Sequence, residues 1–386
     1  MSAGQPQPER LDVDAILADS GVRIVVCCGA GGVGKTTTAA ALALRAAELH
    51  GRRTVVLTID PARRLAQALG LTALDNSPRQ VKVDAGDNPG TGGELHAMML
   101  DMKRTFDEVV LTHTDPRRAE EIFANPFYQA MSSTFSGTQE YMAMEKLGQL
   151  RARDEWDLIV VDTPPSRSAL DFLDAPQRLA RFLDGRMLRL MLAPARAGGR
   201  SMFSLVTASF GVFSRAVQRI LGSQLLTDLS GFVAALDSTF GGFRERAERT
   251  FRILQDRETA FLVVAAPEPD AIREASFFAG RLAEQRMPLH GLVLNRVHAV
   301  GTQLSVADSL AAAEALDATG EHPATADVLR IHAGLAAAVA REAEVTARFT
   351  AEHPDVPVVP VAAQPADVHD IDGLRAIGAA LADSAS

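Results

Sequence analysis

Cysteine is almost absent from this chain of 386 residues: only Cys27 and Cys28 occur, side by side in one apolar run. Adjacent residues of a strand point to opposite faces, so these two thiols are poorly placed to share a metal ion or form a disulfide. No second cysteine pair exists and the histidines lack ligand-like spacing, so we expect no zinc site. We expect both cysteines to be small, buried hydrophobic residues.

Positive charge is also limited, and little of it comes from lysine. The lysines among the 39 basic residues are Lys35, Lys82, Lys103 and Lys146. The net charge of −9 gives no electrostatic support for nucleic-acid binding, and we expect no such partner. No window has the roughly 18 consecutive apolar residues of a membrane span. Because residues 1–14 also lack a signal-peptide pattern, we expect a cytoplasmic protein.

Short apolar segments alternate with helical patterns along the chain. This alternation predicts an α/β fold with a mainly parallel sheet and helices on both faces. The predicted strands are 23–28, 54–59, 95–101, 157–162, 260–266, 291–297 and 356–361. Prolines in the last strand favour an edge position, whereas the glycine, proline and aspartate residues of 75–93 predict a mobile loop.

Helical patterns also interrupt and extend this α/β core. Residues 103–150 are expected to be mainly helical, and two helical insertions are expected at about 181–255 and 303–350, forming a helical subdomain. The expected organisation is a tail and short helix over 1–20, one domain over 21–375, and a C-terminal tail over 376–386.

The strongest chemical signal is a glycine-rich loop between the first predicted strand and a helix. It matches G-x-x-x-x-G-K-[ST], whose backbone N–H groups surround phosphate oxygens at a helix N-terminus. We expect Lys35 to pair with the β- and γ-phosphates and the Thr36 hydroxyl to hold Mg²⁺. The predicted nucleotide-binding residues of the loop are Gly29, Ala30, Gly31, Gly32, Val33, Gly34, Lys35, Thr36 and Thr37.

Two aspartates stand at the ends of predicted strands. Asp60 follows the second strand and Asp162 ends LIVVD, so both side chains are expected at the carboxyl edge of the sheet, where α/β ligands bind. A strand-terminal aspartate is often only the cap of the next helix. Together with the loop, however, these positions predict a magnesium site formed by Thr36, Asp60 and Asp162, with Asp60 and Lys35 as catalytic residues.

Several motifs in one order carry a family resemblance. They are GAGGVGKTT, LTIDPARRLAQALG, HAMMLDMK, SGTQEYMAMEKL, IVVDTPPSRSALDFLDAP and LVLNRV. The order resembles the family of arsenite-pump (ArsA-type) ATPases and guided-entry (Get-type) ATPases, which target tail-anchored proteins. The resemblance covers roughly 22–182 and 258–375. It looks most like the actinobacterial branch, which occurs as paired genes for two related subunits.

The resemblance implies a P-loop NTPase fold of the deviant Walker A class that binds ATP and Mg²⁺. Asp60 matches the switch I aspartate that orients the attacking water, and 162–170 matches switch II. Asn295 matches the asparagine that reads the adenine edge, and the loop around Pro360 would cover the adenine. Such proteins work as dimers whose two nucleotide sites face each other, and nucleotide binding and hydrolysis close and open the dimer.

The chain departs from this pattern in its loop and in both switches. The family's loop usually begins G-K-G-G, and its first lysine reaches the partner's phosphates, but this position is Ala30. A cation on the transferred phosphoryl group is worth roughly 10³–10⁵ in rate. Arg63 and Arg167 also replace the common histidine and a glycine of the switches. We therefore expect one subunit of an ATP-hydrolysing heterodimer, or alternatively a non-catalytic regulatory subunit.

Two further departures bear on the partners. Arsenite pumps bind the metalloid through thiolates, and guided-entry proteins carry a bridging CxxC in the region of 303–350, which has no cysteine here. We therefore expect neither an arsenite pump nor zinc bridging. Residues 187–243 are rich in large apolar residues. They predict a helical subdomain packed on its own core or on a partner subunit or, alternatively, a groove for a membrane-protein client.

Overall fold

The computed structural model describes residues 9–60, 64–83, 92–125, 128–129, 138–164, 241–320 and 322–383. The chain divides into two compact units. The first comprises Met1–Met99, Leu150–Leu170 and Ile253–Ser386, and the second comprises Leu100–Gln149 and Asp171–Arg252. The domain boundaries expected from the sequence stay predictions.

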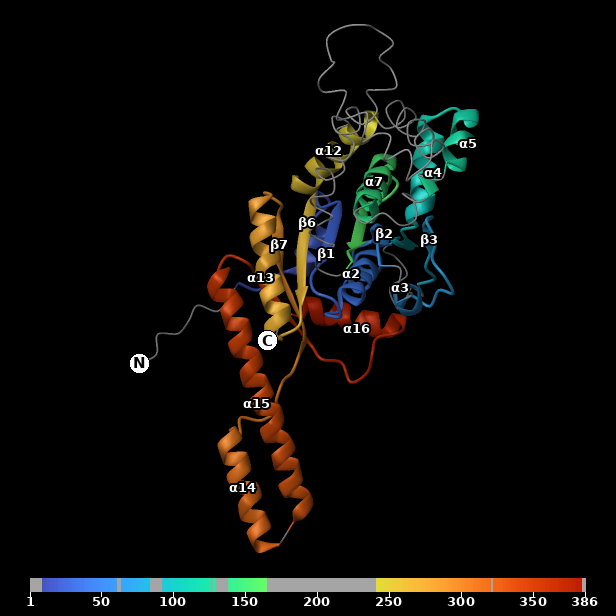
Figure 1. Cartoon of the computed structure of the whole chain (residues 1–386). Coiled ribbons are helices and arrows are strands. Elements are labelled where there is room, and N and C mark those ends of the chain that lie inside the picture. The colour runs from blue at the N-terminus through green and yellow to red at the C-terminus, as the bar shows by residue number, and fades with distance from the viewer. Residues whose placement is uncertain are drawn as a thin grey trace, which may run out of the picture. The chain divides into compact units, whose positions relative to one another are not determined.

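The first unit contains an eight-stranded sheet with the order β3-β4-β2-β5-β1-β6-β7-β8 (Figure 1). The strands are β1 (Ile24–Cys28), β2 (Arg53–Thr58), β3 (Arg79–Gln80), β4 (Glu94–Met99), β5 (Leu158–Asp162), β6 (Thr259–Ala265), β7 (Leu289–Val297) and β8 (Val358–Ala362). Neighbouring strands run parallel except for β3 and β4, which are antiparallel. The predicted mainly parallel sheet is confirmed.

The first unit also contains helices, several of which pack on the sheet. They are α1 (Val13–Ala18), α2 (Lys35–His50), α3 (Arg64–Ala68), α13 (Pro269–Glu284), α14 (Val306–Thr319), α15 (Pro323–Glu352) and α16 (Ile371–Ala382). The alanine-rich α2 packs on β1, β2 and β5, α13 packs on β6 and β7, and α16 packs on α2 and β8. Every residue of β1, β5 and β6 is buried, as expected for parallel strands covered on both faces.

Strand β1 lies where the order of strand connections reverses. The chain passes from β1 to β2 on one side of it, while β6 pairs with its other edge. In open α/β sheets, ligands bind at such a switch point, outside the carboxyl ends of the strands. The glycine-rich loop leaves β1 at this position and enters α2 at Lys35.

The sequence prediction fails within the expected loop 75–93. Residues Arg79–Gln80 form β3, which is antiparallel to β4, and Val81 is only 3% exposed in the core. Val81 and Val83 alternate with Lys82 over only three residues among turn-forming residues, which is too short to predict a strand, so tertiary pairing decides this segment. The edge position of β8 is confirmed, since its prolines remove ladder donors that an outer strand does not need.

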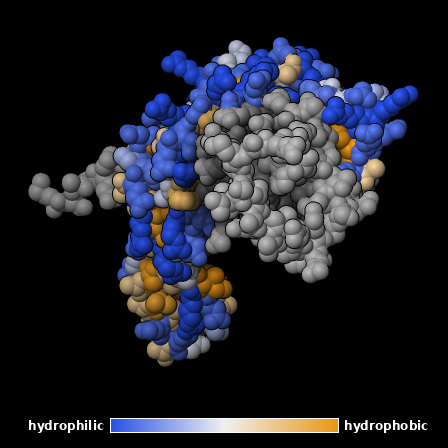
Figure 2. Space-filling view, turned by 45° about the horizontal axis from the view of Figure 1, so that its top comes forward, coloured by the Kyte–Doolittle hydropathy of each residue, from blue (hydrophilic) through white to orange (hydrophobic). Residues whose placement is uncertain are grey.

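Helices α14 and α15 form an antiparallel hairpin that projects from the sheet (Figure 1). Ser309 and Ala313 of α14 are buried against α15. The outer surface carries apolar residues, which Figure 2 shows toward the end of the hairpin; Leu310, Val328 and Ile331 are 43%, 63% and 71% exposed. Among the helices of the described residues, none combines the length and apolar character needed to cross a membrane.

The second unit is helical where the structure describes it. It contains α4 (Met102–His113), α5 (Pro116–Ala124) and most of α7 (Thr138–Arg153) and α12 (Gly241–Gln255), which confirms the helices expected in 103–150. Two ion pairs, each with one buried side chain, connect these helices: the buried Lys146 with the partly exposed Glu108 at 2.9 Å, and the buried Glu145 with the partly exposed Arg246 at 3.1 Å. The predicted client groove of 187–243 lies almost entirely outside the described residues.

Candidate nucleotide site

Backbone geometry explains two glycines of the loop between β1 and α2. Gly29 has φ 150°, and a Cβ atom there would lie 2.0 Å from the carbonyl oxygen of Val264 on β6. Gly34 has φ 97°, and its Cβ would lie 2.2 Å from Nδ2 of Asn295 on β7. Both positions therefore require glycine for steric reasons. The shape of the loop is therefore restricted by the neighbouring strands β6 and β7, which lie close to it, and not by the loop sequence alone.

Lys35 begins α2 and is held against the loop. Its Nζ donates a hydrogen bond of 2.7 Å to the carbonyl oxygen of Ala30, and the residue is only 7% exposed. Burial lowers the pKa of Lys35, whereas the negative charges of Asp162 and Asp60 raise it. The ammonium group is thus positioned across the loop, at the helix N-terminus that favours anions.

Asp162 ends β5 and is completely buried. Its Oδ2 accepts hydrogen bonds from the hydroxyls of Thr36 and Thr58, both at 2.8 Å. Burial raises the pKa of Asp162 to about 6, and the two hydroxyls and Lys35 oppose this rise. Among the described residues, none donates a hydrogen bond to the other carboxylate oxygen, Oδ1, although this oxygen is also buried.

A buried carboxylate oxygen without a donor, next to a threonine hydroxyl, suits a hard cation. Mg²⁺ prefers oxygen ligands and is usually held by one or two carboxylates together with substrate phosphates. Thr36 and Asp162 therefore fit Mg²⁺, and the Thr58 hydroxyl orients the carboxylate of Asp162 by donating a hydrogen bond to its Oδ2. Thr58 was not among the site residues predicted from the sequence. It lies two residues before Asp60 at the end of a strand, where side chains alternate between faces, so its side chain could have been expected on the same face as that of Asp60.

Asp60 follows β2 at the same sheet edge. Its backbone N–H donates to the hydroxyl of Thr58 at 3.2 Å, and its side chain lines the cavity described next. The rest of the predicted switch I, residues 61–63, and the predicted switch II residues 165–170 lie outside the described residues. The contributions of Arg63 and Arg167 therefore stay predictions.

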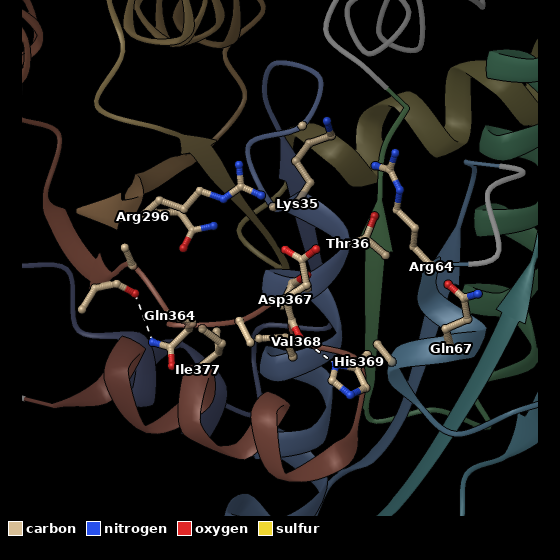
Figure 3. A pocket seen from close by; sticks show the side chains of 18 of the residues that line it. Lys35, Thr36, Arg64, Gln67, Arg296, Gln364, Asp367, Val368, His369 and Ile377 are labelled. Atoms are coloured by element: carbon tan, nitrogen blue, oxygen red, sulfur yellow. Dashed lines mark hydrogen bonds between the residues drawn. The ribbon is translucent and has the colours of Figure 1, made fainter. Parts of the chain in front are cut away.

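A cavity of about 680 Å³ opens beside the loop (Figure 3). This volume lies within the range of roughly 300–1,000 Å³ that is typical of small-molecule sites. The lining residues from the loop and α2, the segment after β2 with α3, and the end of β5 are Gly32, Gly34, Lys35, Thr36, Thr37, Asp60, Arg64, Gln67, Ala68 and Thr163. Those from the end of β7, β8, the segment that follows and α16 are Asn295, Arg296, His298, Ala362, Ala363, Gln364, Ala366, Asp367, Val368, His369 and Ile377.

The far end of the cavity is built by the end of β7. Asn295 donates from Nδ2 to the carbonyl oxygen of Val33 at 2.8 Å and is 9% exposed, so it supports the loop directly. Arg296 has φ 63°, a left-handed conformation that is uncommon for a residue with a side chain, and the pairing with β8 shifts here. This backbone turn directs Arg296 into the cavity (Figure 3).

The structure gathers most, but not all, of the predicted residues around this cavity. Lys35, Thr36, Thr37, Asp60 and Asn295 line it, while Asp162 is hydrogen bonded behind Thr36. Of the rest of the loop, Gly32 and Gly34 line the cavity, and the loop residues outside its lining are Gly29, Ala30, Gly31 and Val33. Pro360 is exposed in β8 and is not among the lining residues, whereas Ala362, Ala363 and Gln364 are.

The sequence analysis missed several lining residues. Arg64, Arg296, Asp367 and His369 point toward the cavity from α3, the end of β7 and the segment before α16 (Figure 3). Arg64 lies in the LTIDPARRLAQALG segment and Arg296 directly follows Asn295 in LVLNRV, so both could have been suspected, whereas Asp367 and His369 belong to none of the motifs.

Comparison with known proteins agrees with this geometry. The family model described as anion-transporting ATPase matches residues 22–305. The ATPase GET3 of Malassezia globosa is 23% identical over 288 residues, covering 73% of this chain and 75% of that protein. The ATPase GET3C of Arabidopsis thaliana is 28% identical over 282 residues (70% and 65%), and the ATPase ASNA1 homolog 1 of Paramecium tetraurelia is 24% identical over 287 residues (73% and 77%). The chain therefore belongs to the anion-transporting ATPase family, and its prediction as an ATPase is confirmed at the level of that family.

Proposed function

We propose that the chain binds Mg-ATP in the cavity beside the loop and hydrolyses it there. The observation that carries this proposal is the buried Asp162 carboxylate, which is bound on one oxygen by Thr36 and Thr58 and lacks a donor from the described residues on the other. Bound Mg²⁺ would supply charge neutralisation to the β- and γ-phosphates. Thr36 and Asp162 are the residues that would hold it.

The chain's own residues divide the remaining work. Lys35 pairs with phosphate oxygens and exchanges its hydrogen bond to the Ala30 carbonyl for them. Asp60, at the same end of the cavity, orients the attacking water and accepts its proton. Asn295 keeps the loop in shape through Val33, and its amide is also the proposed contact to the adenine edge. The residues after Pro360 that line the cavity, Ala362, Ala363 and Gln364, are proposed to lie over the adenine.

We further propose that this chain is one subunit of a heterodimer. Ala30 is only 9% exposed and belongs to the apolar core, so the position offers no cation to a facing site. A partner that retains lysine there would complete the site on this chain. The same observation supports the alternative of a non-catalytic regulatory subunit, in which nucleotide binding shapes a complex without turnover.

Arsenite transport is not part of the proposal. Both cysteines are buried in β1, and burial raises the pKa of Cys28 to about 12 and that of Cys27 well above its usual value. Thiols in this state do not supply the thiolates that a metalloid needs. A role in targeting membrane-protein clients through residues 187–243 remains an alternative proposal, which rests on the family resemblance and the composition of that segment.

Nucleotide binding by Lys35→Ala tests the proposal. The attraction between the ammonium and a phosphate charge at 4 Å is about 4 kcal/mol at an effective dielectric constant of 20, before desolvation. We expect calorimetry to detect no Mg-ATP binding at concentrations that saturate the wild type. Lys103→Ala, which removes an exposed lysine paired with Asp107 in the second unit, is the matched control. ATP affinity of Lys35→Ala within twofold of wild type would refute the site.

A further inference from the structure

The segment between β8 and α16 is held in one conformation by its own side chains. His369 donates from Nδ1 to the carbonyl oxygen of Asp367 at 2.7 Å, a contact drawn in Figure 3. Gln364 donates from Nε2 to the carbonyl oxygen of Ala362 at 3.1 Å. Asp370 caps α16 by accepting from the N–H of Gly373 at 2.7 Å. The backbone that carries Asp367 is therefore fixed from both sides.

Helix α16 connects this segment rigidly to the phosphate-binding loop. Arg375 donates two hydrogen bonds, of 2.8 and 3.0 Å, to Oε1 of Glu48 on α2. At Gly378 the two helices are in ordinary van der Waals contact, since a Cβ atom there would lie 3.5 Å from the carbonyl oxygen of Ala41. Because α2 begins at Lys35, the position of Asp367 relative to the loop is set by one packed pair of helices.

The carboxylate of Asp367 lies in the middle of the cavity. Figure 3 shows it between Thr36 at the phosphate end and Arg296 on the opposite side. The apolar lining close to it is formed by Val368 and Ile377, which suit the flat face of a base. A nucleotide whose phosphates lie at the loop and whose base lies at the far end places its ribose in this middle region.

The charge of Asp367 determines what it can bind there. An ionised carboxylate only accepts hydrogen bonds, and it repels phosphate oxygens. The group it suits must therefore present donors and carry no negative charge. The vicinal 2′- and 3′-hydroxyls of a ribose present two such donors, and a carboxylate can accept both.

We propose that Asp367 binds the ribose hydroxyls and makes the site selective for ribonucleotides over deoxyribonucleotides. This inference rests on the proposed nucleotide site and adds to it the residue that recognises the sugar of the nucleotide. The wild type should bind ATP about tenfold more tightly than 2′-deoxy-ATP, which corresponds to 1.4 kcal/mol.

The test is the ratio of ATP to 2′-deoxy-ATP affinity, measured by calorimetry with Mg²⁺ for wild type, Asp367→Ala and Asp367→Asn. Removing a negative charge from the cavity changes the affinity for both nucleotides alike, so the ratio isolates the sugar contact. We expect a ratio near ten for wild type, near one for Asp367→Ala, and an intermediate value for Asp367→Asn, whose amide keeps one acceptor. Asp355→Ala removes the same charge from an exposed residue outside the cavity lining and should keep the wild-type ratio.

Other outcomes would overturn the inference in distinguishable ways. Binding that does not depend on Lys35 would mean that the proposed nucleotide site is wrong. Binding that depends on Lys35, with an equal ratio in wild type and Asp367→Ala, would leave the nucleotide site intact and refute the ribose contact. If Asp367→Ala instead changes the preference for ATP over ITP, Asp367 reads the amino group of the base and the ribose inference is wrong.

Discussion

The side chain of Asn295 donates a hydrogen bond of 2.8 Å to the carbonyl oxygen of Val33, across 262 residues of sequence. It joins the end of β7 to the phosphate-binding loop after β1, two segments at the carboxyl edge of one sheet. The same amide lies where a side chain at Gly34 would have to fit. The shape of the loop therefore depends on a strand that is remote in sequence.

Alanine substitutions at Gly32 and Gly34 distinguish the steric effect of Asn295 on position 34 from the effect of backbone strain. Gly32 and Gly34 both have positive φ, of 78° and 97°, but no atom lies within 4 Å of a Cβ at Gly32, whereas one at Gly34 meets Asn295. We expect Gly32→Ala to cost about 1 kcal/mol of stability, from strain alone. Gly34→Ala should cost more and weaken Mg-ATP binding at least tenfold.

Denaturant unfolding and calorimetry on the two variants measure these effects. In a chain that already carries Asn295→Ala, the steric conflict at position 34 is removed. Gly34→Ala should therefore cost less stability in that background than in the wild type. Equal effects of Gly32→Ala and Gly34→Ala would show that the contact with Asn295 does not limit position 34.

Asp60→Asn should separate binding from hydrolysis. An amide cannot accept the proton of the attacking water, and general-base catalysis typically contributes 10²–10⁴-fold. We expect Mg-ATP affinity to stay within about threefold of wild type while the single-turnover rate falls about 100-fold or more. Asp355→Asn, at an exposed residue, provides the control. An unchanged rate would show that Asp60 only caps the segment after β2.

The raised pKa of Asp162 predicts a dependence of stability on pH. The folded state binds the proton of this carboxyl more tightly than the unfolded chain does, because the pKa rises from 3.8 to about 6. The free energy of unfolding should therefore fall as pH rises from about 3 to 7, by up to about 3 kcal/mol in total. Well below pH 3.8 the carboxyl is protonated in both states and costs nothing.

Comparison with Asp162→Asn isolates this contribution, since the other titrating groups are shared by both proteins. The difference in free energy of unfolding between variant and wild type should grow in favour of the variant between pH 4 and 6. Mg²⁺ should stabilise the ATP-bound wild type much more than the ATP-bound variant. Parallel pH profiles for the two proteins would show that Asp162 keeps an ordinary pKa on folding.

The alanine at position 30 predicts asymmetric catalysis in a dimer. Position 30 supplies no cation to a facing site, yet the chain's own site retains Lys35, Thr36, Asp60 and Asp162. Mixing it with a related subunit that has a lysine at the corresponding position should raise the hydrolysis rate by up to roughly 10³-fold over either subunit alone. Replacing the partner's lysine with alanine should remove the increase. A stable homodimer with the same rate in both conditions would refute the heterodimer.

Each site residue that was predicted correctly as part of this sheet edge stands in or next to a short local pattern of the sequence. The glycine-rich loop identified Lys35 and Thr36, and apolar strands that end in aspartate placed Asp60 and Asp162 at the same sheet edge. These inferences worked because a P-loop is a local structure between one strand and one helix. The alternation of strands and helices likewise predicted the parallel sheet, since each unit of that fold is short and regular.

The lining residues at the end of β7 and in the segment before α16 reach the cavity only through tertiary packing. Arg296 enters it through a left-handed backbone turn at a shift in strand pairing, and Asp367 reaches it because α16 packs on α2. Arg296 directly follows Asn295 in LVLNRV and Asp367 lies in no motif, but nothing local to either residue shows that its side chain reaches the cavity. The physical reason is that this wall is assembled from β7, β8 and α16, whose contacts with the loop depend on packing between segments more than 250 residues apart.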